Sequence, residues 1–125
     1  IVNAENRIDG NREQLIVQIK RLYLKQQRYW PDGAPAAPFA RAQDSPEENA
    51  FQRFVLEMSN AELESYWLRL KQTQGETPPR GIGSARILIR QVSIRAGALG
   101  VVVKAEADAS PDIKTLFEFE GAPND

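Results

Sequence analysis

Helical segments alternate along this chain with short extended segments, and this alternation limits the fold more than any other feature. Residues 1–3 read as the end of a short buried strand. From residue 12 to residue 24 the apolar positions fall on one helix face, with Asn11 as N-cap and Gln14 in capping-box position. Residues 34–40 are extended, and their two prolines limit them to a short or edge strand. The pattern favours an α/β fold.

The clearest helix start lies at residues 45–48. Ser45 caps the helix, a proline occupies its first position, and Glu48 completes a capping box. The next helix begins at Ser59 or Asn60, and a further one follows Ser84. The apolar faces expected for these three helices are Phe51, Phe54, Val55 and Met58; Leu63, Tyr66, Trp67 and Leu70; and Ile87, Leu88 and Val92.

The C-terminal third should complete the sheet. Residues 97–103 form an apolar, β-branched run that predicts a buried strand, and residues 113–119 alternate as a last strand would. Residues 104–112 read as a polar connection, and a polar tail starts at about residue 120. The predicted order is strand, helix, strand, helix, helix, helix, strand, strand. We expect residues 1–125 to form a single domain with helices covering a small sheet.

Composition removes several classes of function. The 125 residues include no cysteine and no histidine, so thiolate nucleophiles, the commonest general base and the commonest metal ligand are missing. We therefore expect no enzyme, no metal site and no cofactor. An isoelectric point near 5.6 argues against nucleic acid as a partner. No apolar run approaches the roughly 20 residues that span a bilayer.

Charge is nearly balanced overall but is distributed in blocks. Residues 31–65 carry two basic and seven acidic side chains, whereas residues 66–104 carry seven basic and one acidic. No carboxylate side chain lies between Glu76 and Glu106. The basic block allows a local anion site, and the alternation of blocks could steer the chain toward a partner or toward a second copy of itself.

Several short motifs occur in the order and approximate spacing of a known family. They are Leu22-Tyr23-Leu24, Trp30-Pro31-Asp32-Gly33, Asp44-Ser45-Pro46, Phe51, Val55-Leu56, Ala61-Glu62-Leu63, Tyr66-Trp67, Leu70, Thr77-Pro78-Pro79, Gly83-Ser84 and Gly97-Ala98-Leu99-Gly100-Val101-Val102. Together they resemble the short phosphate ABC transporter substrate-binding-like proteins of the type II periplasmic-binding fold. The resemblance covers about residues 1–103.

The resemblance implies one lobe of that fold, with a small mixed sheet flanked by about four helices. It implies a periplasmic or secreted protein whose signal peptide has been removed. The chain opens at Ile1 rather than Met, which predicts removal of an upstream segment. Full-length phosphate receptors trap the anion between two lobes, so a chain of one lobe is expected to bind it weakly or together with a partner.

The first candidate anion site also comes from the resemblance. Full-length relatives offer an arginine and a Ser-Gly-Thr turn at a helix N-terminus, and Arg41 and residues 45–47 match those positions. Here, however, Pro46 has no N–H to donate, and two glutamates follow it. The alternative is a plain helix cap, in which Ser45 binds no ligand.

The second candidate comes from the residues themselves. Gly83 would let the backbone approach a ligand closely, and Ser84 would cap a helix whose first N–H groups stay free. Arg86 and Arg90 share one face of that helix. The alternative is a loop followed by a solvated basic helix face.

Two classes of function remain open. One is an exported binding module for a small oxyanion such as phosphate. The other is a ligand-free interaction or regulatory module on the same lobe, which would serve a membrane transporter or sensor protein or associate with itself.

Overall fold

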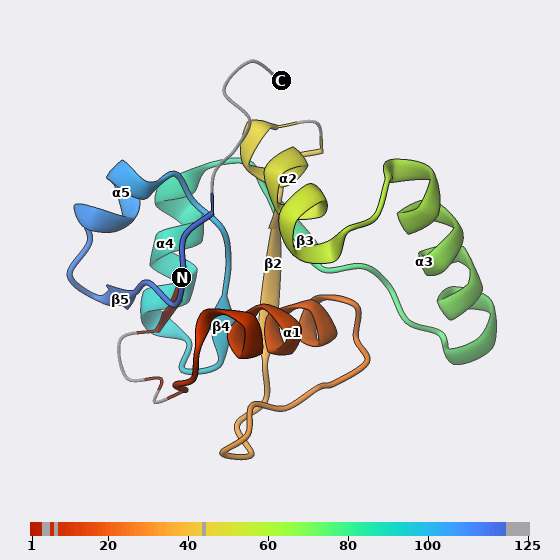
Figure 1. The fold of residues 1–125 in the computed structure, drawn as a ribbon, viewed down its shortest axis with the longest axis horizontal. Helices are drawn as coiled ribbons and strands as arrows, with labels where there is room; N and C mark the ends of the chain where they lie inside the picture. Colours follow the sequence, from red (N-terminus) through yellow and green to blue (C-terminus); the bar gives the residue numbers. More distant parts are fainter. Residues whose placement is uncertain (4–5, 7, 44, 120–125) are drawn as a thin grey trace.

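The computed structural model describes residues 1–3, 6, 8–43 and 45–119. The elements follow in the order β1 (Val2–Asn3), α1 (Arg12–Tyr23), β2 (Ala37–Arg41), α2 (Pro46–Phe51), the π-helical turn η1 (Gln52–Leu56), α3 (Asn60–Gln74), β3 (Arg80–Ile82), α4 (Ala85–Ile94), β4 (Ala98–Leu99), α5 (Lys104–Asp108) and β5 (Ile113–Lys114). The mixed α/β class predicted from the sequence is confirmed, as Figure 1 shows.

The five strands form one sheet in the order β3-β2-β4-β1-β5. Strand β2 lies inside the sheet, parallel to both β3 and β4, while β1 runs antiparallel to β4 and β5. Pro38 is tolerated inside the sheet for a geometric reason. The N–H of Ala37 points to β4, so Pro38 faces β3, where pairing starts only at Phe39. Of the two alternatives for this segment, the short strand is the one that forms.

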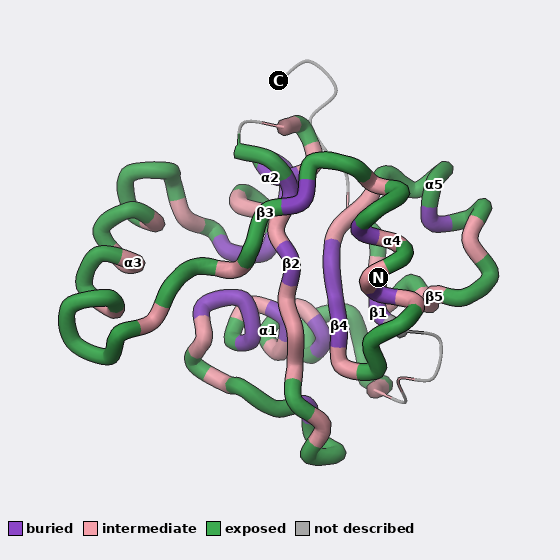
Figure 2. Tube along the Cα trace, turned by 180° about the vertical axis from the view of Figure 1, so that it is seen from behind, coloured by how far each residue is buried: buried purple, intermediate pink, exposed green. Residues whose placement is uncertain are grey.

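The sheet has a separate apolar core on each face. Helix α1, the end of α2 and η1 cover one face, where Leu22, Val55 and Leu99 belong to the same buried cluster. Helix α4 covers the other face with Leu88 and Val92. Adjacent side chains of a strand point to opposite faces, so Ala98 joins the second cluster while Leu99 joins the first. The buried stretch of β4 is visible beside β2 in Figure 2.

The last two strands are shorter than predicted. The regular pairing of β4 covers Ala98 and Leu99, opposite Ala37 and Pro38 of β2 and Val2 of β1. Strand β5 is equally short, with Ile113 and Lys114 opposite Asn3 and Val2 of β1. The predicted polar connection at 104–112 contains α5, and β3 was not predicted as a strand. Elements of two to five residues are too short to show a hydrophobic period.

Two predicted core residues are exposed instead. Phe54 is 42% exposed because α2 continues as a π-helical turn, whose wider spacing places Leu56 against the core. Ile87 is 53% exposed because α4 packs on the sheet through Leu88 and Val92. In both helices the prediction was wrong about which residues of the helix pack against the sheet.

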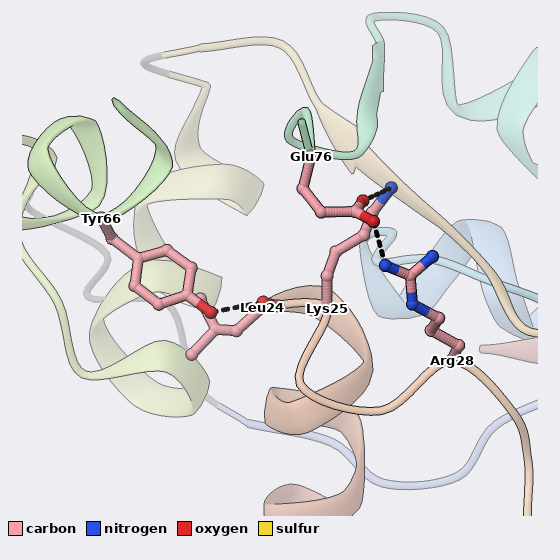
Figure 3. A network of polar contacts seen from close by, with 5 residues as sticks. All are labelled: Leu24, Lys25, Arg28, Tyr66 and Glu76. Atoms are coloured by element: carbon pink, nitrogen blue, oxygen red, sulfur yellow. Dashed lines mark hydrogen bonds and ion pairs between the residues drawn. The ribbon is translucent and has the colours of Figure 1, made fainter. Parts of the chain in front are cut away.

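Helix α3 packs loosely on the rest of the molecule. None of its residues is buried, and its predicted inner face is only partly buried. Figure 3 shows what holds it: the Tyr66 hydroxyl donates to the Leu24 carbonyl at 2.5 Å, and Glu76 pairs with Lys25 and Arg28. The helix is also well terminated, with a capping box at Ser59 and a left-handed glycine at its C-terminus.

Candidate functional site

The residues nominated from the sequence gather at one edge of the sheet. Arg41 ends β2, and Ser45 lies in the loop that follows it; Gly83 and Ser84 directly follow β3, and Arg86 lies in the first turn of α4. Because β2 and β3 run parallel, the segments after them meet at the same edge. In open α/β sheets this carboxyl edge is the usual place for a ligand site.

Arg41 is 6% exposed and its side chain bonds to the backbone of the protein. Its Nε donates to the Ile82 carbonyl at 3.0 Å, and its two terminal nitrogens donate to the carbonyls of Gly83 at 3.0 Å and Val101 at 3.1 Å. The guanidinium thereby ties β2 to the start of α4 and to the chain beyond β4. We assign Arg41 a positioning role at this edge.

The turn at Ser45 uses its polar groups within the chain. The Ser45 N–H donates to the Ala42 carbonyl at 3.1 Å, and its Oγ accepts the Glu48 N–H at 3.2 Å. The serine cap is confirmed, but the predicted reciprocal bond from Glu48 is wrong. The Glu48 side chain turns instead to β2, where it accepts the Arg41 N–H at 3.0 Å. With Glu47 beside it, this helix start already carries two carboxylates in its first turn.

The burial of Glu48 was not predicted from the sequence. It is 9% exposed, and burial raises its pKa, although hydrogen bonds from the Arg41 N–H and the Gln52 side chain and the nearby Arg41 charge oppose that rise. No cationic group lies within ion-pair distance of its carboxylate among the described residues. The sequence signal was only a capping box, which fits a solvent-exposed glutamate equally well.

The start of α4 differs from the start of α2. Ser84 Oγ accepts the Ile87 N–H at 3.3 Å, so the serine caps the helix as predicted. The first two helical N–H groups, at Ala85 and Arg86, have no partner among the described residues. An open depression of about 600 Å³ runs along the side of the same helix between Ser84 and Ser93, and its described lining includes Arg86 and Arg90 but no carboxylate.

A second concavity lies under α3 and was not foreseen. It has a volume of about 500 Å³ and lies between α3 and the carboxyl ends of β2 and β3. Its lining includes Arg41, Glu48, Glu64 and Trp67. These residues come from β2, α2 and α3, and the cleft depends on how α3 lies over the other two elements, so no local motif could have shown it.

Comparisons with known proteins leave the family open, since no protein-family model, curated protein or solved structure matches this chain. Within the described residues, no helix is long and apolar enough to cross a membrane. The same part of the chain holds no cluster of three or more potential metal-ligating side chains.

Proposed function

We propose that this chain is a single-lobe, substrate-binding-like module of the phosphate ABC transporter type, and that it binds a small oxyanion such as phosphate weakly. The sequence resemblance motivates the family, and the mixed α/β architecture is compatible with one lobe of the type II periplasmic-binding fold. The basic depression along α4, which begins at Ser84, is the observation that carries oxyanion binding.

The chemistry of that depression favours an anion over a cation. Two unpaired N–H groups and the positive end of the helix dipole lie at the start of α4. Arg86 and Arg90 add two formal positive charges along the same helix face. The Arg41 guanidinium donates a hydrogen bond to the Gly83 carbonyl, which restrains the loop before the helix. Ser45 contributes to the neighbouring helix cap rather than to this depression.

The proposal extends to the setting of the protein. An exported lobe of this kind would work in the periplasm or outside the cell, after loss of a signal peptide, beside a membrane transporter or sensor protein. We propose no enzymatic activity and no cofactor, because the sequence supplies no histidine or cysteine for nucleophilic or acid–base chemistry. We propose no nucleic-acid partner, because the isoelectric point is near 5.6.

An amide NMR titration with phosphate tests the proposal, with sulfate as a second anion and chloride at matched ionic strength as the control. We expect saturable shifts at residues 83–87 and none at Ser45. Arg86→Gln should weaken the response at least about threefold, and the matched control Arg69→Gln, on the exposed side of α3, should leave it unchanged. Equal responses to phosphate and chloride would overturn oxyanion binding.

One observation favours a second candidate, a ligand-free interaction or regulatory module. The start of α2 carries two carboxylates, and Pro46 offers no N–H there, as expected of a site that no longer takes an anion. Exposed apolar residues on other helices, Leu68 and Ile94 among them, could then contact a protein partner or a second copy. Concentration-dependent self-association, measured by analytical ultracentrifugation together with a flat phosphate titration, would favour this candidate.

A further inference from the structure

The cleft under α3 has the size and lining of a small-molecule site. Its volume of about 500 Å³ falls in the range of known ligand pockets. Trp67 and the consecutive prolines Pro78 and Pro79 supply apolar walls, while Glu48 and Glu64 supply carboxylates. The cleft shares no lining residue with the depression along α4.

The contacts of α3 explain why this space is not filled by the protein itself. The helix is held near its middle by Tyr66 and just past its end by Glu76, both of which bind the segment after α1 (Figure 3). Between these contacts and the sheet, Leu63 and Trp67 remain only partly buried. Apolar side chains in a protein core normally pack to crystal-like density. With α3 held by these contacts to the segment after α1, a cleft remains between this helix and the ends of β2 and β3.

The charged groups of the cleft that remain available to a ligand are carboxylates. The guanidinium of Arg41 is directed to the carbonyls of Ile82, Gly83 and Val101. Glu48 accepts two hydrogen bonds, from the Arg41 N–H and from the Gln52 side chain, and a carboxylate has about four acceptor positions. A buried carboxylate without an ion-pair partner gains most from a cation that enters beside it.

We propose that this cleft binds a small organic cation, an ammonium or guanidinium group on a short apolar stem. The charged group lies against Glu48 and Glu64, and the stem packs on Trp67 and the two prolines. An aromatic face beside carboxylates is a common way to hold such cations. This site is independent of the anion site proposed above, because it lies on other residues and takes the opposite charge.

The test uses n-butylammonium and n-butylguanidinium as ligands, with n-butanol as the uncharged analogue and sodium chloride for ionic strength. Amide and indole NMR shifts are followed during each titration. We expect saturable shifts at Glu48, Glu64 and the Trp67 indole with the cations only. The Trp30 indole, which is buried and bonded to the Gly97 carbonyl at 2.9 Å, is an internal control and should not move.

Matched variants identify the groups responsible. Glu48→Gln keeps an acceptor for the Arg41 N–H and should weaken binding at least about tenfold, which is the size of one charge-assisted hydrogen bond. Glu64 is exposed, so we expect Glu64→Gln to leave the fold intact. This variant should weaken binding by about threefold. The same change at the exposed Glu13 of α1 should have no effect.

The outcomes separate this inference from the proposed function. Butanol shifts equal to those of the cations, or unchanged affinity in both Glu48→Gln and Glu64→Gln, would overturn it. A capped Gly-Arg-Gly peptide that binds at least ten times more tightly than the free cations would overturn the assignment to a small molecule. Phosphate titrations report at residues 83–87, so failure of either site can be read independently.

Discussion

Helices α2 and α4 begin on the same plan but differ in what they can bind. Each follows a strand of the parallel part of the sheet, and each is capped by a serine whose Oγ accepts the N–H three residues later, at 3.2 Å for Ser45 and 3.3 Å for Ser84. At α2, two glutamates follow the cap. At α4, the first turn has no acidic residue and includes Arg86.

The comparison shows that a serine cap alone does not define an anion site. In α2 the protein supplies its own negative charge to the helix dipole, and the Ser45 N–H is used in the preceding turn. In α4 the dipole is left without a carboxylate, so an external anion would complete it. Arg41 connects the two regions because it ends the strand before α2 and binds the carbonyls before α4.

The largest effect is expected from Arg41→Met, which breaks this connection. The variant leaves three carbonyls without their donors, and we expect a loss of about 3 kcal/mol or more in the free energy of unfolding, measured with urea. Arg41→Lys should recover little of it, because one ammonium cannot reproduce the planar fork that reaches three carbonyls. Near wild-type stability of both variants would show that the three hydrogen bonds of the Arg41 guanidinium do not stabilise the fold.

The next largest effect is expected from Glu48→Ala. The Arg41 N–H would lose its partner in a buried position, which should cost about 1–3 kcal/mol, whereas Glu48→Gln should retain most of the stability. Urea unfolding of the two variants at one pH makes the comparison. Equal losses in Ala and Gln would mean that the negative charge, rather than the accepted hydrogen bond, is what matters.

The wild type and Glu48→Gln should also differ in pH dependence. Burial raises the pKa of Glu48 above its ordinary value of 4.5, so the folded state binds the proton more tightly than the unfolded state does. The contribution of this group to stability is therefore greatest below about pH 4.5 and is lost as the pH rises through the raised folded pKa. The wild type should lose stability relative to Glu48→Gln over that window, and an opposite slope would contradict the assignment.

Removing either serine cap should lower the stability of the protein by about the same amount, but the two variants should differ in their response to phosphate. Ser45→Ala and Ser84→Ala should each lose about 1 kcal/mol in thermal or urea unfolding. Saturating phosphate should stabilise the wild type and Ser45→Ala, and should stabilise Ser84→Ala less. A phosphate effect reduced in Ser45→Ala alone would move the anion site to α2.

The smallest effects come from exchanging the charges of the two helix starts. Glu47→Gln should destabilise α2 by about 0.3–1 kcal/mol, because it removes a favourable charge from the positive end of the dipole. Arg86→Glu should stabilise α4 by a similar amount at low salt while it abolishes the phosphate shifts. Loss of stability together with retained phosphate binding in Arg86→Glu would reverse the interpretation of α4.

The helix starts were predictable because they depend on neighbouring residues. Asn11, Ser45 and Ser84 cap their helices as predicted, and of the two residues offered for α3, Ser59 is the cap. A cap needs only a short side chain and an N–H three residues away. Strands β3, β4 and β5 were missed or overextended, because their length is set by partners that are distant in sequence.

The candidate site was predictable only in part. The sequence placed Ser84 and Arg86 at a helix start, and that local arrangement is what the structure contains. It also offered Arg41 as a cationic partner of an anion, yet the guanidinium binds three carbonyls that the fold brings to it from residues 82, 83 and 101. The cleft under α3 depends on where its contacts with the segment after α1 hold that helix, which no local pattern records.

The sequence by itself determined the α/β class, the caps at Asn11, Ser45 and Ser84, and the lack of histidine and cysteine side chains, because these follow from residue type and short spacing. The tertiary structure alone decided that the Arg41 side chain binds three backbone carbonyls, that Glu48 is buried beside it, and that a cleft remains open under α3. Each of these depends on contacts between segments separated by up to sixty residues, and the free energy of such contacts is fixed only when the sheet brings the segments together.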